Sequence, residues 1–405
     1  MKSSLLIFTL IFSLIQNVLS QEKLVLSAED LFTEIKLKSK QSTNSNKVLY
    51  ESFLDKIKSD AYSEQTKNEL AVCLFSHYIE CGSFFSFQKA FEDHAALFEN
   101  KPILKKYWET ISLEFKEQYK AMLKSAEMLL RKSENAGDNQ NISDAYRLLA
   151  RSKMYLNEKD SSLLYANLSL NFAKRSDSKI AVAYTFRDLS DIQAHFDMIG
   201  KSTSTLLKLN QEAERIKDYR LLCWSTLMIA ERSFQVNSFN EAKTYYRKAL
   251  NIAEKNNLNT YKVRIFKGLT EIELSTNKLE AALTNINKGY NSFDKGNKSI
   301  FYFDFKSTHA KYLIEIDSLD EAKIILADNL EDYSKYNSSR GLGKTHHLIG
   351  KLYFHQKKWK KAQTAFKQSQ SILNNLPDSE YSLGNYKLLA QVFAEQNQFQ
   401  RAFDN

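Results

Sequence analysis

Residues 343–345, Gly-Lys-Thr, match the last residues of a phosphate-binding loop, in which backbone N–H groups and a lysine hold phosphate. The full motif needs a glycine five residues earlier, where this chain has Ser338, and it needs a buried strand before the loop. The sequence predicts no such strand. The repeat register described below places Lys344 at the start of a helix, so we expect no nucleotide site.

Histidine and cysteine offer little further chemistry. His347 and His355 could share a helix but would lie about 12 Å apart, too far for one metal ion. Cys73 and Cys81 are equally far apart on one helix, beyond the roughly 7 Å that a disulfide spans. Cys223 stands beside a tryptophan and fits buried packing. We find no catalytic constellation, and therefore expect no enzyme, no metal and no cofactor.

The composition indicates that helices position these side chains. The chain has 405 residues but only 2 prolines and 10 glycines, too few turn formers for a β-sandwich or a doubly wound α/β protein. Cysteine is also too rare for a disulfide framework, so stability must come from helix packing. An all-α fold is the simplest prediction.

Small residues recur every forty positions in the second half of the chain. This row comprises Ser202, Ala242, Ala282, Ala322, Ala362 and Ala402. An apolar residue precedes each member by three positions, and a large one follows most of them by four, which makes one buried helical face. A second row of small or compact residues lies twelve positions earlier: Ala150, Ser190, Ala230, Thr270, Ala310, Gly350 and Ala390. Two narrow places on successive helices predict tight antiparallel packing.

The clearest unit contains Gly350, Tyr353, Ala362, Phe366 and Pro377. This arrangement resembles the tetratricopeptide repeat. The resemblance covers residues 143–405, as six to seven units with the last incomplete, and implies an all-α, right-handed solenoid of antiparallel helix pairs. Because the usual unit has about 34 residues, a spacing of forty implies longer helices.

The resemblance also implies which side chains face the concave surface. Positions 2, 5, 9 and 12 of each first helix point there in the family, with Gly350 taken as position 8. The expected partner-binding residues are Arg147, Arg151, Tyr184, Arg187, Trp224, Leu227, Arg264, Lys267, Lys311, Lys344, His347, Lys351 and Lys387. They form an interrupted basic row beside an aromatic and apolar patch. An acidic or carboxylate-bearing protein or peptide is the partner that such a surface favours.

The remaining segments predict the organisation of the chain. Residues 1–20 have the charged, apolar and cleavage-site order of a signal peptide, so we expect an exported, periplasmic or extracytoplasmic protein. Residues 21–47 read as a polar connector, and residues 48–135 as a helical region of degenerate repeats or a cap. The turn within 133–143 is the expected boundary. Because the chain stops inside a repeat, either the final unit is covered by another element or the chain is a fragment of a longer protein, in which a membrane helix beyond residue 405 is one possibility.

We therefore predict a non-enzymatic scaffold that binds a protein or peptide. It resembles the exported repeat regions that form the sensory half of some bacterial regulators. The alternative is a secreted structural component of an envelope assembly. A eukaryotic secretory origin stays open. The chain carries a net charge of +9, but its 48 acidic residues are mixed among 57 basic ones and no nucleic-acid module is recognisable, so no nucleic-acid partner is expected. The sequence does not identify the ligand or the oligomeric state.

Overall fold

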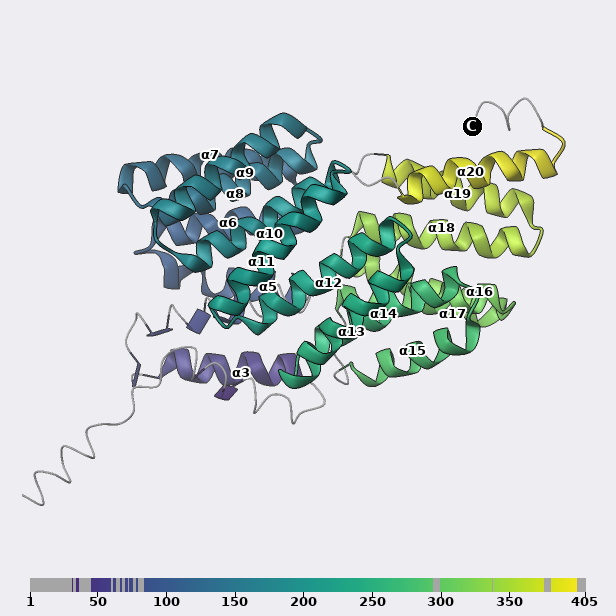
Figure 1. The fold of residues 1–405 in the computed structure, drawn as a ribbon, viewed down its shortest axis with the longest axis horizontal. Helices are drawn as coiled ribbons and strands as arrows, with labels where there is room; N and C mark the ends of the chain where they lie inside the picture. Colours follow the sequence, from purple (N-terminus) through teal and green to yellow (C-terminus); the bar gives the residue numbers. More distant parts are fainter. Residues whose placement is uncertain are drawn as a thin grey trace, which may run out of the picture. The chain divides into compact units, whose positions relative to one another are not determined.

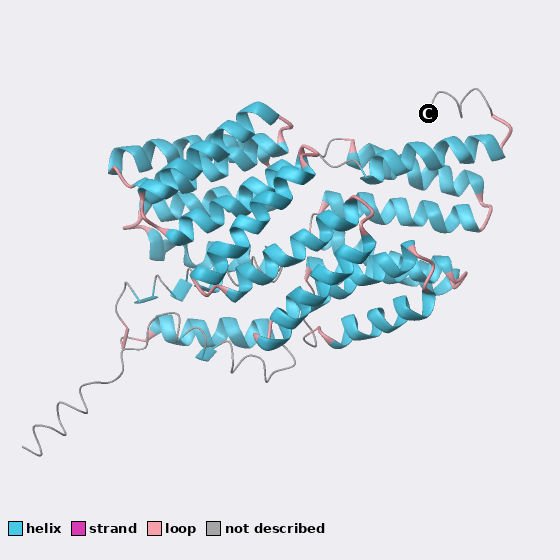
Figure 2. Cartoon of the chain, in the orientation of Figure 1, coloured by secondary structure: helices cyan, strands magenta, loops and turns pink. Residues whose placement is uncertain are grey.

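Helices form nearly all of the part of the chain that the computed structural model describes, and no strand occurs among these residues (Figures 1 and 2). These are residues 31, 34–35, 45–59, 61–62, 66–67, 70–71, 73–75, 78, 84–293, 299–336, 338–374 and 380–398. The predicted signal peptide and the last small residue, Ala402, lie outside them, as does most of the predicted connector.

The chain divides into two units, at His77 and Tyr78. The first contains α3 (Ser45–Lys58), which therefore begins inside the predicted connector. Leu49, Phe53 and Ile57 are buried at intervals of four residues, as expected for an amphipathic helix.

The second unit contains every other described helix. Its N-terminal helices are α5 (Phe84–His94), the 3₁₀ helix η1 (Ala95–Phe98), α6 (Pro102–Phe115) and α7 (Tyr119–Ala136). The regular stack continues through α8 (Asn139–Tyr155), α9 (Lys159–Arg175), α10 (Lys179–His195), α11 (Ile199–Arg215), α12 (Tyr219–Gln235), α13 (Phe239–Lys255) and α14 (Asn259–Ser275). It ends with α15 (Leu279–Asn291), α16 (Ile300–Glu315), α17 (Leu319–Lys335), α18 (Ser339–His355), α19 (Trp359–Leu373) and α20 (Glu380–Glu395). Each helix from α6 to α20 packs against its predecessor (Figure 1).

The forty-residue period arises from two helices of equal length. Helices α8 to α14 each have 17 residues, and three residues join each to the next. Most of these joints contain a residue with positive φ, such as Asn157 at 59°, Asp197 at 57° and Asn237 at 59°. Asn and Asp tolerate this left-handed conformation better than other non-glycine residues. They therefore take the role that glycine, scarce in this chain, usually has.

Capping marks the first helix of most pairs. Asp138, Ser178 and Asp218 accept hydrogen bonds from backbone N–H groups at the starts of α8, α10 and α12. Ser338 caps α18 in the same way, so the serine that breaks the phosphate-loop motif has a structural role. Residues 343–345 lie inside α18 rather than in a loop before it, as the register predicts.

The predicted small rows lie at helix contacts. Ala242, Ala282, Ala322 and Ala362 are fully buried. Two serines bond across these contacts: Ser202 Oγ donates to Ser190 O, and Ser162 Oγ, forty residues earlier, donates to Ala150 O, each at 2.8 Å. A second kind of bond joins residues 26 apart, as where Ser169 Oγ donates to Ser143 O at 2.9 Å. The α8–α9 pair is thus closed at two levels.

The stack begins earlier than predicted. Pro102 is the first residue of α6, as expected for proline in the first turn. Helices α6 and α7 pack as a pair, and Glu117 between them has the positive φ, 55°, of the other joints. Thr110 and Met122 occupy the two small-residue positions, and both are fully buried. The segment 133–143 contains a turn, but α7 packs against α8 across it, so the expected boundary lies inside one unit.

Candidate binding site

A cavity of about 1320 Å³ lies within the second unit. Its walls come from the ends of α8, α10 and α12, the middle of α14, and parts of α13, α16 and α20. Three of the predicted partner-binding residues line it: Arg264, Lys267 and Lys311. The lining also includes polar joint residues such as Asn157 and Asp197. The cavity therefore combines side chains from first helices with side chains from the joints that follow them.

Acidic residues neutralise part of the expected basic row. Lys311 Nζ lies 3.0 Å from one Glu271 oxygen and 3.1 Å from the other, and Thr308 Oγ1 also donates to Glu271 at 2.9 Å. Burial opposes ionisation of Glu271, but the charges of Lys311 and Lys267, with these hydrogen bonds, lower its pKa to about 2. Glu271 is thus a fixed carboxylate in the wall.

Lys267 has neither a hydrogen bond nor an ion pair among the described residues, although it lies close to several charges. Burial alone would lower its pKa, but the charges of Glu271 and Asp304 outweigh that effect and raise the pKa. Lys267 therefore remains an ammonium ion with hydrogen-bond donors available to the cavity.

Two lysine ammonium groups lie near the ring of Tyr381, which also lines the cavity. Its ring centroid lies 5.7 Å from Lys311 Nζ and 5.5 Å from Lys344 Nζ, within the range of cation–π attraction. The edge of His347 packs against the ring at a centroid separation of 5.1 Å. His347 itself is only 8% exposed, and its Nδ1 lies 2.8 Å from Asn385 Oδ1. His347 therefore supports Tyr381 from behind rather than facing a partner.

Aromatic side chains also line the cavity. Phe196, Phe234 and Tyr246 contribute to it, beside an ion pair between Arg264 Nη2 and Glu231 Oε1 at 3.5 Å. Gly268 allows Tyr246 to approach α14, because a Cβ at Gly268 would lie 2.2 Å from the tyrosine hydroxyl oxygen. The cavity thus offers an apolar region near its charged end.

The predicted arginines of α8 are bound within the protein. Arg147 Nε donates to Asp188 Oδ2 at 2.8 Å and its Nη1 to Asp144 Oδ1 at 2.8 Å. Arg151 pairs with Glu114 of α6 and with the other oxygen of Asp188, at 3.0 Å. Burial opposes ionisation of Asp188, but the arginine charges lower its pKa to about 2. This network joins α6, α8 and α10.

The predicted aromatic patch is largely internal. Leu227 is fully buried and Trp224 is 6% exposed, because α12 is covered on several sides by neighbouring helices. The Leu227 prediction is therefore corrected: this residue belongs to the core. Arg187 packs over Trp224 at 5.0 Å and near Tyr184 at 6.0 Å, and its Nε has no hydrogen-bond partner among the described residues. None of these four side chains lines the cavity.

The last predicted residues lie apart. Lys351 is 3.7 Å from Glu315 Oε1, and Lys387 is exposed on α20. Neither lines the cavity. The thirteen predicted residues therefore do not form one continuous surface. Lys311 and Lys344 lie over the Tyr381 ring, and Lys267 and Arg264 line the same cavity.

Sequence reasoning missed several contributors. Glu114, Asp188, Glu231 and Glu271 complete the charge pattern, and Tyr381 adds the ring. Glu231 and Glu271 hold position 9 of their repeats, the position that Lys311 holds in the next repeat. Carboxylates and an ammonium group at one position of successive repeats were the signal that could have predicted the ion pairs. Tyr381 precedes the positions used to define the concave face, so the register gave no reason to select it.

One contact joins distant parts of the chain near the cavity. Arg340 of α18 lies beside the phenol of Tyr119 of α7, whose ring stacks on Tyr155 at a centroid distance of 4.4 Å. Tyr155 lines the cavity together with Asn374, the residue after α19. Burial and the charge of Glu117 raise the pKa of Tyr119 to about 12, against the opposing charge of Arg340. The phenol is therefore a neutral hydrogen-bonding group at ordinary pH.

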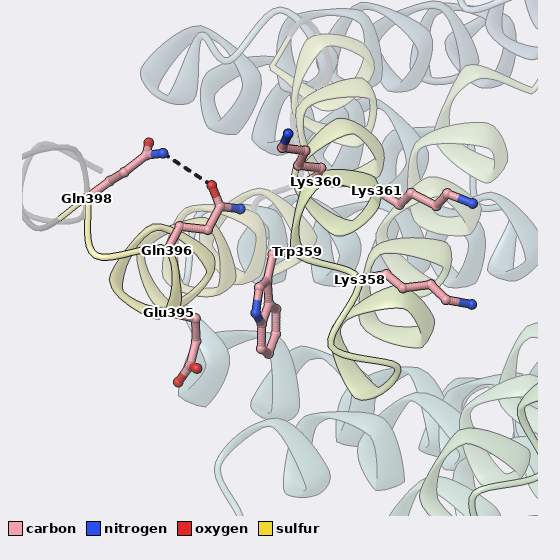
Figure 3. Close-up of a pocket in the computed structure, with 7 residues that line it drawn as sticks. All are labelled: Lys358, Trp359, Lys360, Lys361, Glu395, Gln396 and Gln398. Atoms are coloured by element: carbon pink, nitrogen blue, oxygen red, sulfur yellow. Dashed lines mark hydrogen bonds between the residues drawn. The ribbon is translucent and has the colours of Figure 1, made fainter.

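A second hollow, of about 520 Å³, lies between the start of α19 and the end of α20 (Figure 3). Trp359 forms one wall, and Gln398 Nε2 donates to Gln396 Oε1 at 3.3 Å. Lys358 and Lys361 point away from the tryptophan into solvent (Figure 3). This hollow shares no lining residue with the cavity, and its exposed lysines do not define a ligand.

Other sequence motifs have structural roles. Cys223 is fully buried, and burial raises the pKa of its thiol to about 12, as expected for a packing residue rather than a nucleophile. Within the described parts of the chain, no three His, Cys, Asp or Glu side chains are grouped to hold a metal ion. No described helix is both long and apolar enough to span a bilayer.

No protein-family model matches the chain, and no curated protein matches its sequence. Solved structures do share its fold. NprR in complex with its cognate peptide NprX is 12% identical with a TM-score of 0.55, over 82% of this chain and 95% of that one. A Rap protein complexed with competence and sporulation factor is 12% identical with a TM-score of 0.53, over 93% and 97%. The signal transduction ATPase PH0952 from Pyrococcus horikoshii, which has a tetratricopeptide repeat sensor, is 13% identical with a TM-score of 0.54, over 90% and 55%. These similarities confirm the predicted all-α, tetratricopeptide-like solenoid.

Proposed function

We propose that this chain is a non-enzymatic scaffold that binds a peptide or an extended protein segment in the cavity. The observation that carries the proposal is the cavity itself, which is about 1320 Å³ and is lined by aromatic rings, amides and separated charges. A peptide presents apolar side chains and many hydrogen-bonding groups, so a wall of this mixed character suits it. Two structures of similar fold, NprR and a Rap protein, were solved with NprX and with competence and sporulation factor.

A matched pair of bulky substitutions tests the site. Ala194 lines the cavity, so Ala194→Trp should fill part of it and abolish capture of peptides from the native culture medium or extract, detected by mass spectrometry. Ala327 is exposed on α17 outside the cavity, so Ala327→Trp should leave capture unchanged. Equal capture by the wild type and Ala194→Trp, with both variants folded by circular dichroism, would place binding elsewhere.

We also propose that the protein acts outside the cytoplasm. The support is the order of Lys2, an apolar run over residues 5–15, and Ser20 before Gln21, which is typical of a cleaved export signal. Mass spectrometry of native protein should find a chain beginning at or near Gln21. Recovery of intact residues 1–20 from a cytoplasmic fraction would refute this proposal without affecting the peptide-binding one.

A further inference from the structure

Three side chains at one end of the cavity hold donors that the protein leaves unused. They are Lys267 on α14, Lys344 on α18 and Tyr381 on α20. All three are partly buried, and among the described residues neither ammonium group nor the tyrosine hydroxyl has a hydrogen bond or ion pair. Polar groups that a bound ligand covers need hydrogen-bond partners, as buried polar groups in proteins do. Three unused donors beside one cavity therefore indicate a place for an external acceptor.

The charges at this end of the cavity indicate the charge of the ligand group that would accept these hydrogen bonds. Lys267, Lys311 and Lys344 supply three ammonium groups, while Glu271 and Asp304 supply two carboxylates, which leaves one net positive charge. Glu271 is occupied by Lys311 and Thr308. Asp304 accepts a hydrogen bond from Tyr333 Oη at 2.8 Å. A singly charged anion balances this end, whereas a phosphomonoester would bring a charge of about −1.5 to −2.

We propose that Lys267, Lys344 and the Tyr381 hydroxyl form a subsite for one carboxylate of the bound peptide. The inference rests on the proposed peptide-binding function and makes it specific. Ammonium and phenol groups donate directly to a carboxylate, and such charge-assisted bonds are stronger than neutral ones. The carboxylate comes either from the peptide C-terminus or from an aspartate or glutamate side chain.

The subsite also has a defined neighbourhood. Lys267 and Tyr381 both line the cavity, and so do Arg264 and the aromatic side chains Phe234 and Tyr246. A peptide whose carboxylate binds at Tyr381 can therefore place an apolar side chain in the aromatic region. This gives the ligand two recognisable features, one acidic and one apolar.

The experiment uses the full protein and synthetic nine-residue peptides of random sequence in two forms, one with a free C-terminal acid and one with a C-terminal amide. Peptides captured by the immobilised wild-type protein are identified by mass spectrometry, and the strongest is resynthesised for titration. Its amide form and its Asp→Asn or Glu→Gln form distinguish the two sources of the carboxylate. We expect one of these neutral forms to bind at least about tenfold more weakly, the effect of losing one charge-assisted bond.

Variants then connect the peptide carboxylate to the protein. Three variants each remove one donor: Lys267→Gln, Lys344→Gln and the nearly isosteric Tyr381→Phe. Each should lower the affinity for the acid peptide by up to about tenfold and should barely change the affinity for its neutral form. Lys288→Gln combined with Lys323→Gln is the control, because both lysines are exposed on second helices outside the cavity. Thermal melts check that each variant folds.

The outcomes separate the two proposals. If the wild-type protein captures no peptide of either form, the proposed function fails and this inference falls with it. Capture with equal affinity for the acid and every neutral form overturns the carboxylate subsite and leaves the function standing. Preference for a phosphorylated peptide over its carboxylate counterpart would also overturn it, because the charge balance predicts a single negative charge.

Discussion

At the scale of single residues, buried carboxylates hold several of the predicted cations. Asp188 holds both Arg147 and Arg151, and Glu271 holds Lys311. Buried pairs of this kind are costly to break, because a partner left behind is an uncompensated charge in a poorly solvated place. Lys267 is partly buried beside the same carboxylate and has no such partner among the described residues, so it is the informative cation.

Asp188→Ala should destabilise the second unit by about 3 kcal/mol, the lower end of the range for breaking a buried ion pair, because Asp144 and Glu114 still pair with the two arginines. Urea unfolding measures the change. Glu331→Gln is the control: this residue pairs with Lys335 on the surface, where both side chains are more than 60% exposed, and its loss should cost less than about 1 kcal/mol. Similar costs for the two variants would contradict the buried network.

His347 predicts a loss of stability in mild acid. Burial, together with the charges of Lys351 and Lys311, lowers its pKa to about 4, although the hydrogen bond with Asn385 opposes the shift. An unfolded histidine titrates near pH 6.5. Between these values the unfolded chain binds a proton that the folded chain excludes, so stability falls as the pH drops from about 6.5 to 4, by up to about 3 kcal/mol.

Urea melts across this range measure that loss. His355→Gln should keep it, since His355 is exposed at the end of α18. His347→Gln should flatten the slope. An unchanged slope in His347→Gln would assign the pH dependence to other groups.

At the scale of elements, the helix contacts depend on small side chains and the joints depend on left-handed residues. Ala282 and Ala362 are fully buried where helices approach, so Ala282→Glu or Ala362→Glu adds a buried charge to steric overpacking that alone costs about 1–3 kcal/mol. Both variants should lower the melting midpoint measured by circular dichroism. The exposed Ala327→Glu should not. Unchanged melting midpoints for both buried variants would contradict the assignment of these alanines to helix contacts.

The joints offer a stabilising change. Lys217 has a φ of 56° between α11 and α12, a conformation that costs a residue with a Cβ about 1–2 kcal/mol. Lys217→Gly should relieve this strain, and the gain should exceed the entropy that glycine loses on folding by about 0.5 kcal/mol. Thermal melts can detect that shift. Lys201→Gly, at an exposed position inside α11, should instead destabilise by about 1 kcal/mol.

The register was predictable because small residues repeat at one spacing, and each marks a helix contact. The α6–α7 pair escaped notice because Met122, a large residue, fills the position where later pairs have a small one. The site was only partly predictable. Lys267 and Lys311 follow from the register, but the pairing of Lys311 with Glu271 and the approach of Tyr381 depend on packing between repeats. Leu227 shared the position of the cations and is nevertheless core, since α12 is more enclosed than its neighbours.

At the scale of the whole second unit, the contact between Arg340 and Tyr119 joins helices far apart in the sequence. A linear repeat array contacts only its neighbours and can open locally. Arg340→Gln should therefore increase hydrogen exchange at the start of α7 and the start of α18, measured by mass spectrometry. Arg215→Gln, on exposed α11, is the control. Equal protection in the wild type and Arg340→Gln would mean that this contact does not restrain opening.

The same contact bears on how long a ligand stays. Tyr119 stacks on Tyr155, and Tyr155 lines the cavity with Asn374, so the wall on that side consists of segments that only tertiary contacts hold together. Loosening this wall gives a bound peptide a wider way out of the cavity. We therefore expect peptide residence times to be shorter in Arg340→Gln than in the wild type. Stopped-flow dissociation measures both, and equal rates in the two proteins would mean that the wall does not govern release.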